Sequence, residues 1–390
     1  MGRVFVVFCI DTEGPFTDPN YQFPSQLIGN WKDIDRIFLS KVFSDKFRYS
    51  FPDSNNNPAV FTWFMLNWTG FRTNPIQHDF GYHKVYDHYL KTWGKEIKKY
   101  GDEIGWHYHH ASISGIGNEW GTDWFTNREY ENQLCRFIID CNFFPITYRA
   151  GGTIEDTDQS NWLEQWIPYD YSNRNGDHIN WKKIEADGSK LIDILPWHKA
   201  PNSWVPYHPS NADLTKPGDM KRLVVRSLDI KSNVNIITEE EIAKAFADAK
   251  KGSDIILSLF DHDFRDREQD FTKVMEWISK YSKKEKIKFF YKSGKDAIKQ
   301  FQNISSIKPL KLNIKKSNEK INIKTNKTLF NKQPFLAIKY SKNIYSWKPL
   351  FKISEDTWEY KLLPEDKNKN FGVAAHDLEG NTYTKVFKMI

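Results

Sequence analysis

The feature that most constrains the fold is a regular alternation of short apolar runs and amphipathic stretches over about the first 300 residues. The apolar runs predict buried strands at 3–10, 59–66, 103–107, 145–149, 169–172, 191–195, 254–260 and 287–291. The stretches between them predict helices at 31–47, 85–100, 129–142, 157–165, 239–250, 271–283 and 294–302. Strands that alternate with helices form a parallel sheet, and about seven or eight such units close into a barrel. We therefore expect an α/β fold built on a (β/α) barrel of about seven strands.

Chemically unusual side chains gather where these predicted strands end. The first strand leads into Asp11 and Glu13, which alternation places on the same side of the chain. Because the strands of a (β/α) barrel end at one face, where its chemistry takes place, we expect such side chains to converge. The residues expected at that face are Asp11, Glu13, His107, His109, His110, Arg149 and His262.

Three histidines, His107, His109 and His110, lie within four residues of a chain that has 11 in all. Imidazole is the commonest protein ligand for a transition metal. A polar surface loop with unrelated histidines would explain the cluster taken alone. The carboxylates and the arginine at other strand ends favour a metal site instead.

The pattern changes after Pro309, where short segments alternate with a period of two between turns rich in Asn and Lys. They predict strands at 310–315, 321–325, 335–340, 347–353, 357–362, 371–375 and 383–387, which make a small all-β sandwich. Residues 304–390 contain 17 Lys, no Arg and 8 acidic residues, so their net charge is +9, and the rest of the chain carries −3. We divide the chain into a barrel domain, 1–303, and a Lys-rich β-sandwich module, 304–390.

Composition narrows the partners and the compartment. Lysine without arginine is typical of a solvated surface, so we expect no nucleic-acid partner. We expect no membrane span, because no apolar run is long enough for one. The amino-terminal apolar run is too short for a signal segment and three Cys make no disulfide framework, which together predict a cytoplasmic protein. The aromatic content of 16% suits either an aromatic core or stacking on sugar rings. A homo-oligomer is left open.

Four motifs carry a family resemblance. They are Asp11-Thr-Glu-Gly14, Glu103-Ile-Gly-Trp-His-Tyr-His-His110, Tyr148-Arg-Ala-Gly-Gly152 and Leu259-Phe-Asp-His-Asp263. In this order they resemble the motifs of the polysaccharide deacetylases, the NodB-homology proteins of carbohydrate esterase family 4, over roughly residues 3 to 300. The resemblance implies a distorted (β/α) barrel and a divalent metal, usually zinc, held by one Asp and two His. It also implies a second Asp as base, an Arg that tethers it, a His as acid, and removal of N-acetyl, O-acetyl or formyl groups from sugars.

The motifs depart from the family pattern at three places. Thr12 stands where the family has a second adjacent Asp, so Glu13 would have to supply the carboxylate ligand. The family spaces its two histidine ligands four residues apart, whereas position 111 is Ala here. Gly151 stands where the family usually has Pro. Similar changes occur in divergent branches of the family, some of which work without the usual metal.

Carried over residue by residue, the resemblance implies a metal on Glu13, His107 and one of His109 and His110. Amide hydrolysis also needs a base for the attacking water and an acid for the leaving amine. Asp11 would be the base, tethered by Arg149, and His262 would be the acid. Asp11 and Glu13 could exchange roles.

Several other residues are candidates for supporting roles. Trp106, Tyr108, His198 and His208 are candidates for lining a substrate groove, although burial suits Trp106 equally well. Asp261 could orient a histidine, and His262 or Asp263 could instead cap the following helix.

Three functions compete. The leading one is a metal-dependent hydrolase that removes an N-acyl group from a sugar or from a sugar-linked precursor of a surface polysaccharide or glycolipid. The second is a metal-independent hydrolase of a non-sugar C–N bond. The third is a carbohydrate-binding protein on a degenerate barrel. The module could bind sugar, mediate oligomerisation or act as a packing lid.

Overall fold

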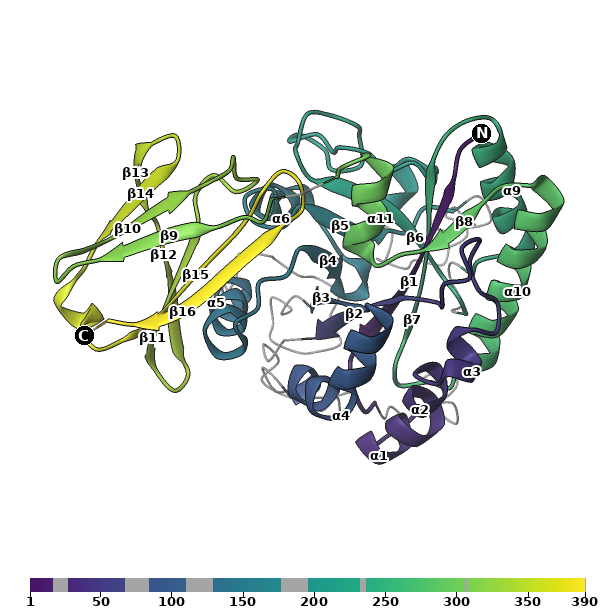
Figure 1. The fold of residues 1–390 in the computed structure, drawn as a ribbon, viewed down its shortest axis with the longest axis horizontal. Coiled ribbons are helices and arrows are strands. Elements are labelled where there is room, and N and C mark those ends of the chain that lie inside the picture. Colours follow the sequence, from purple (N-terminus) through teal and green to yellow (C-terminus); the bar gives the residue numbers. More distant parts are fainter. Residues whose placement is uncertain are drawn as a thin grey trace, which may run out of the picture.

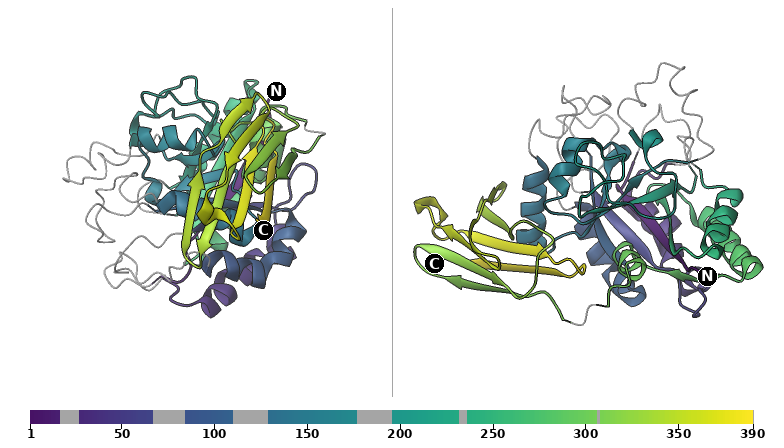
Figure 2. Two further views of the ribbon diagram at one scale, coloured as in Figure 1. Left: turned by 90° about the vertical axis from the view of Figure 1, so that its left-hand side faces the viewer. Right: turned by 90° about the horizontal axis from the view of Figure 1, so that it is seen from above.

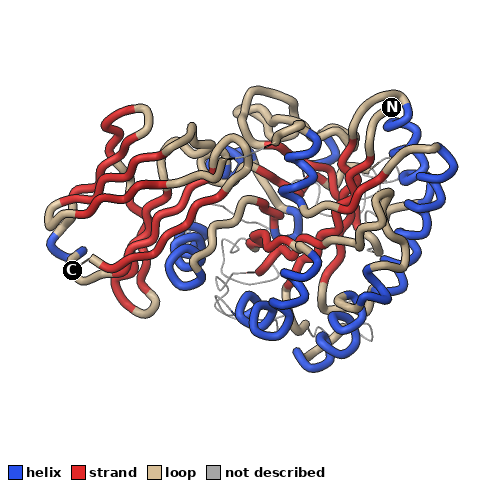
Figure 3. Tube along the Cα trace, in the orientation of Figure 1, coloured by secondary structure: helices blue, strands red, loops and turns tan. Residues whose placement is uncertain are grey.

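The computed structural model describes residues 1–16, 27–66, 84–109, 129–176, 196–231, 236–305 and 308–389. In these residues two bodies lie side by side (Figure 1). Helices surround the sheet of the first body, and strands joined by loops form most of the second (Figure 3). The last helix of the first body ends at Phe301, and the first strand of the second begins at Leu312.

Parallel strands form the sheet of the first body. They are β1 (Val4–Thr12), β2 (Phe61–Leu66), β3 (Glu103–Tyr108), β4 (Thr147–Ala150), β5 (Tyr169–Asn173), β6 (Leu223–Asp229), β7 (Ile255–His262) and β8 (Phe289–Tyr291). Strand β1 pairs with both β7 and β2, so seven strands close into a barrel. The extra strand β8 pairs with the first residues of β1, and β2 takes the same edge from Phe8 onward. The predicted α/β barrel of about seven strands is confirmed.

The barrel strands alternate between an inner and an outer core. Phe5, Val7 and Cys9 of β1 point into the barrel, whereas Val6 and Phe8 point outward into the larger cluster shared with the helices. The main helices are α4 (Lys84–Tyr100), α5 (Glu129–Cys141), α6 (Thr157–Leu163), α9 (Glu239–Lys250), α10 (Glu268–Glu285) and α11 (Gly294–Phe301). Their ends lie within about three residues of the predicted ones.

The segment predicted as one helix over 31–47 is broken. Its first part consists of α1 (Trp31–Asp33), the π-helical turn η2 (Ile34–Leu39) and α2 (Ser40–Val42). A separate helix α3 (Asp45–Arg48) follows, because the extended Ser44 caps it by accepting a hydrogen bond from the Phe47 N–H.

The sequence analysis missed β6. Arg222 precedes this strand and Arg226 interrupts its apolar pattern. Both are buried: the first pairs with Glu155 and Asp170, and the second pairs with Glu241. Buried charge of this kind is hidden from a hydrophobic pattern, because the partners come from distant parts of the chain. The strand predicted at 191–195 lies outside the described residues.

The second body, the module, is a pair of antiparallel sheets. One sheet has the order β13 (Phe351–Ser354), β14 (Thr357–Lys361), β10 (Lys320–Thr325) and β9 (Leu312–Lys316). The other has the order β12 (Ile344–Lys348), β11 (Phe335–Ser341), β15 (Asn370–His376) and β16 (Thr382–Lys388). The predicted strand 347–353 is wrong: Pro349 separates β12 from β13, and these belong to different sheets.

The module packs against the barrel beside α5, as two further views show (Figure 2). The His376 ring stacks on Phe144 at 4.5 Å between centroids, and its Nε2–H donates to the Pro145 carbonyl at 2.9 Å. Trp166 meets the edge of Trp347 at 5.8 Å. Trp358, 4% exposed, lies in the core of the module. Both module tryptophans are therefore engaged in packing.

None of the helices in the described part of the chain combines the length and hydrophobicity that crossing a bilayer requires. The cytoplasmic location stays a prediction.

Candidate active site

The barrel gathers polar side chains from four strands at one end. Asp11, His107, Arg149 and His262 lie at or next to the last residues of β1, β3, β4 and β7. The parallel register pairs Asp11 with His262 and His107 with Arg149. Cys9, two residues before Asp11, belongs to the inner core, so alternation directs the Asp11 side chain into the barrel mouth. Of the residues that the sequence analysis expected at one face, those that the structure describes lie together, and His110 lies outside the described residues.

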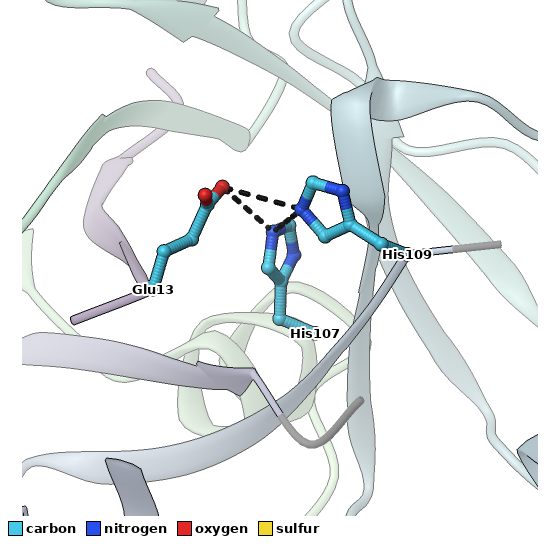
Figure 4. A group of neighbouring side chains, drawn as sticks. All are labelled: Glu13, His107 and His109. Atoms are coloured by element: carbon cyan, nitrogen blue, oxygen red, sulfur yellow. Dashed lines mark hydrogen bonds and ion pairs between the residues drawn. The ribbon is translucent and has the colours of Figure 1, made fainter. Parts of the chain in front are cut away.

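Glu13, His107 and His109 each turn one ligand atom toward a common point (Figure 4). Nε2 of His109 lies 3.1 Å from Nε2 of His107 and 3.2 Å from Oε1 of Glu13. The remaining distance, from Nε2 of His107 to Oε1 of Glu13, is 3.5 Å. Two ligands of one tetrahedral zinc ion, each about 2.0–2.2 Å from it, are roughly 3.3–3.6 Å apart. The chemistry and spacing of the three donors therefore fit a single divalent metal.

A main-chain hydrogen bond sets which nitrogen of His107 faces this point. Nδ1 lies 3.0 Å from the Arg149 carbonyl oxygen, which can only accept, so Nδ1 carries the proton. In the neutral ring Nε2 is then the lone-pair nitrogen, the form that binds a metal. Burial disfavours the charged ring, but the Asp11 and Glu13 carboxylates outweigh it and raise the pKa of His107.

The three ligand atoms cannot all be hydrogen-bonded to one another, because too few of them carry a proton. With His107 neutral and Glu13 ionised, only Nε2 of His109 can hold a proton, and it faces two acceptors. A divalent cation at the common point would satisfy all three atoms together. A second proton on His107 would ease the shortage in a different way, so protons and metal compete for this site.

Among the described residues His109 is the second histidine of the group, and His110 lies outside them. Residues 107 and 109 share one side of the chain, which alternation alone could have indicated. Gly151 makes room for this ring. A Cβ built on Gly151 would lie 2.5 Å from Cδ2 and 2.6 Å from Cα of His109. Gly151 and His109 are two of the positions where the motifs differ from those of the family they resemble, and the two residues lie against each other.

Asp11 is held by Arg149 beside the metal candidate. Nε of Arg149 donates to Oδ2 of Asp11 at 2.9 Å, and Nη1 donates to the Tyr171 carbonyl at 2.6 Å. The guanidinium also lies over the Phe260 ring, 3.4 Å from its centroid. Oδ1 of Asp11 is buried and accepts no hydrogen bond from the described residues, and it lies 3.8 Å from Nδ1 of His107. Nε of Arg149 also lies 2.9 Å from Oδ1, so the arginine forms an ion pair with both carboxylate oxygens.

His262 reaches the same group from β7. Its Nε2 lies 3.6 Å from Oε1 of Glu13 and 3.9 Å from Oδ2 of Asp11, and its side chain is 18% exposed. Asp261 accepts the His262 main-chain N–H at 2.8 Å, but its oxygen is 3.7 Å from Nδ1 of the ring. Asp261 therefore contacts the His262 backbone rather than orienting the imidazole by a hydrogen bond.

Asp263 and Tyr89, to which the sequence analysis gave no role in the site, contact the backbone that carries Glu13 or the residue that holds it. Asp263 is fully buried and accepts hydrogen bonds from the main-chain N–H groups of Glu13 and Gly14 and from the Tyr89 hydroxyl. Burial raises the pKa of Asp263 to about 7, although these hydrogen bonds lower it. The acidic residue after His262 was visible in the sequence, but nothing there indicates that Tyr89 reaches it.

Trp106 and Tyr108 lie on the other side of β3. They are 0% and 1% exposed, and their rings pack in the outer core, 5.6 Å apart, with Tyr148 next to Trp106. Because alternation points them away from His107, the expectation that they line the groove is corrected: both are core residues.

The two remaining groove candidates lie at different ends of the barrel. His198 sits in the short 3-10 helix η4 (Pro196–Lys199), whose Trp197 donates to the carbonyl of Thr153 just beyond β4, so His198 lies toward the site. Exposed His208 contacts the carbonyl of Arg222, which precedes β6, so it lies at the amino ends of the strands. For His208 the groove expectation is corrected, because the site is at the opposite face.

Comparison with known proteins adds little. No family model matches the sequence, and no curated protein matches it. Among solved structures, a Cellulomonas fimi endo-beta-1,4-mannanase double mutant aligns with a TM-score of 0.29 and 9% sequence identity, covering 100% of this chain and 94% of that chain. A TM-score this low supports no argument, so the functional case rests on the site.

Proposed function

We propose that this protein is a metal-dependent hydrolase that removes an N-acyl group, acetyl or formyl, from a sugar or a sugar-linked precursor of a surface polysaccharide or glycolipid. The observation that carries the proposal is the donor triangle of Glu13, His107 and His109, which lies against a buried carboxylate tethered by an arginine. The sugar substrate is inferred from the order of the four sequence motifs.

A divalent metal, with zinc the best match to two imidazoles and a carboxylate, would be held by Glu13, His107 and His109. When bound, it would supply a water of lowered pKa and a Lewis acid for the acyl carbonyl. The two histidines and the glutamate thus fill the ligand role that the resemblance assigned to one carboxylate and two histidines.

Asp11 serves as the general base in this scheme. Both of its oxygens lie 2.9 Å from Nε of Arg149, and of the two only Oδ2 accepts a hydrogen bond from the described residues. A buried oxygen with an unused lone pair can accept a proton from a water at the site. Arg149 acts on Asp11 rather than on the substrate, because its Nε and Nη1 are engaged by Asp11 and the Tyr171 carbonyl.

His262 serves as the general acid. Its Nε2 lies 3.9 Å from Oδ2 of Asp11 and 3.6 Å from Oε1 of Glu13, beside both the proposed base and the metal candidate. The ring is partly exposed, which allows it to reach a leaving amine. Asp11 and His262 then divide the two proton transfers that hydrolysis of an amide requires.

The test begins with elemental analysis of protein purified without chelators or added metal, beside the His107→Ala variant. We expect near-stoichiometric divalent metal in the unchanged protein and none in the variant. Metal-loaded protein is then assayed for release of acetate or formate from N-acetyl and N-formyl sugars. Absence of metal even after soaking in zinc would overturn the proposal. Hydrolysis of a non-sugar C–N bond that survives both chelation and His107→Ala would establish the metal-independent alternative.

A further inference from the structure

Glu13 lies just past the end of the strand that carries it. The last residue of β1 is Thr12, and pairing with β7 ends earlier, at Asp11 and His262. The main-chain N–H groups of Glu13 and Gly14 therefore have no place in a strand ladder. Buried N–H groups need a hydrogen-bond acceptor, and without one the residues that follow β1 would not be held in place. Strand pairing therefore does not hold Glu13 in place, and other contacts must do so.

The Asp263 carboxylate supplies the missing acceptors. Its Oδ1 lies 3.0 Å from the Glu13 nitrogen and 3.1 Å from the Gly14 nitrogen, and Oδ2 also lies 3.1 Å from the Gly14 nitrogen. The Asp263 N–H donates in return to the Asp11 carbonyl at 3.3 Å. Residues 11 to 14 are therefore bound from both sides by one residue, which continues the pairing of β1 with β7 beyond the sheet.

Tyr89 holds this carboxylate from α4. Its hydroxyl donates to Oδ2 of Asp263 at 3.0 Å, and its side chain is fully buried, 5.4 Å from Trp63 between ring centroids. Gly14 is packed as closely, with φ +76° and the Trp31 ring so near that a Cβ would meet it at 2.8 Å. The backbone next to Glu13 is thus fixed by hydrogen bonds and by packing from the first helices of the chain.

We propose that Asp263, oriented by Tyr89, is a positioning residue that places the Glu13 carboxylate for metal binding. This inference rests on the proposed function, since it concerns the same metal site. Groups that orient metal ligands commonly matter to metal affinity as well as to stability. The Asp263 carboxylate meets the N–H groups of Glu13 and Gly14 and the Tyr89 hydroxyl, so its effect on the metal is exerted through the Glu13 backbone.

Asp261 provides a matched control on the other side of His262. It is also a fully buried carboxylate, and its oxygens face Arg265 and Arg267 at 3.8 and 3.3 Å and the His262 N–H. Asp261→Asn and Asp263→Asn each replace one carboxyl oxygen by an amide nitrogen and keep nearly the same shape. A merely structural role for Asp263 predicts equal effects of the two changes on metal affinity, whereas a positioning role predicts different ones.

The experiment measures zinc affinity of the full chain by competition with a chromophoric chelator, together with thermal unfolding of the metal-free proteins. We expect Asp263→Ala to weaken zinc binding about 10- to 100-fold. Asp263→Asn, which keeps one acceptor oxygen, should be intermediate, and Tyr89→Phe should weaken it about 2- to 10-fold. Asp261→Asn should stay within about 2-fold of the unchanged protein even where it lowers the unfolding temperature. The visible spectrum of the cobalt(II)-loaded Asp263 variants should also change, because the ligand geometry is altered.

Each outcome bears on a different claim. Equal zinc affinity and equal cobalt spectra in Asp263→Asn and Asp261→Asn would overturn the positioning role while leaving the metal site intact. If Asp263→Ala does not fold, Asp263→Asn and Tyr89→Phe decide the matter, because both preserve the shape of the core. Absence of zinc binding by the unchanged protein would remove the proposed function and this inference together.

Discussion

Two buried histidines, His107 and His376, each donate a hydrogen bond to a main-chain carbonyl of the segment 145–149. His107 donates its Nδ1–H to the carbonyl of Arg149, and His376 donates its Nε2–H to the carbonyl of Pro145. Both side chains are 0% exposed. Their second nitrogens differ: that of His376 meets the Thr382 hydroxyl at 2.9 Å, whereas that of His107 meets a carboxylate and another imidazole. Burial and one hydrogen bond are therefore shared, and the remaining neighbours separate a structural histidine from a candidate ligand.

The pKa values follow these neighbours. Burial lowers the pKa of His376 to about 3, and the positive charge of Lys295 lowers it further, although the hydrogen bond to the Pro145 carbonyl acts in the opposite direction. The pKa of His107 is raised by Asp11 and Glu13 despite equal burial. The lowered pKa of His376 is typical of a buried histidine that serves in packing. The raised pKa of His107 reflects two carboxylates around it, which would also favour a bound cation.

The largest expected effect comes from removing each ring. His107→Ala should lose metal, weakening zinc binding by more than about 100-fold, and should lose activity with it. His376→Ala should keep metal affinity and lose stability, because it leaves a gap against Phe144 and an unpaired Pro145 carbonyl. Metal analysis and thermal unfolding of both variants make the comparison. Loss of metal from His376→Ala with the fold retained would break the distinction.

The second prediction concerns a histidine that is neither ligand nor core. His262→Ala should retain metal and lose about 10²- to 10⁴-fold in turnover, because the leaving amine is then not protonated. Metal content and steady-state kinetics on the substrate found by screening are the measurements. Full activity in this variant would show that the acid is another group.

The third prediction is a pH dependence of stability that belongs to His376. An unfolded histidine takes up a proton near pH 6.5, but the folded one does so only near pH 3, so stability is constant above about 6.5 and falls below it. Between pH 6.5 and 4.5 the loss should be about 2 kcal/mol. Urea unfolding of the unchanged protein and His376→Gln at both pH values isolates the effect. The difference between them should shrink as the pH falls, and a constant difference would contradict the prediction.

The smallest expected effect is at the glycine that accommodates the second imidazole. Gly151→Ala should weaken zinc binding about 10-fold, because the new Cβ displaces His109. Gly94→Ala is the control, since a Cβ there meets nothing within 4 Å and the helix α4 gains about 0.5–1 kcal/mol. Chelator competition on both variants is the check. Unchanged zinc affinity in Gly151→Ala would mean that His109 is not a ligand.

Much of the barrel was accessible from local patterns. The apolar runs over 3–10, 59–66 and 254–260 became β1, β2 and β7, because a strand buried on both faces needs no partner to be recognised by its composition. Strand β6 escaped the pattern because Arg226 is neutralised by Glu241 from α9, which periodicity does not register. The run 347–353 misled for the opposite reason, since its apolar residues serve two sheets.

The candidate site divides in the same way. That Asp11, His107 and His262 would meet followed from their places at strand ends, a consequence of parallel topology. The hydrogen bonds of Asp263 with Glu13 and Tyr89, and the approach of His109 to Glu13, depend on distances across the barrel. These distances have no local signature, because residues 13, 89 and 263 approach only after the strands close.

By itself the sequence determined the alternation of elements, the all-β character of the module and the kinds of side chain available at the strand ends. Those properties depend on neighbours along the chain, where side-chain period and composition act directly. The tertiary structure alone decided which imidazole nitrogen faces Glu13, which carboxylate holds the loop beneath it, and which buried histidine is packing. Hydrogen bonding and charge depend on distances between residues far apart in the chain, and only the closed barrel and its docked module set those distances.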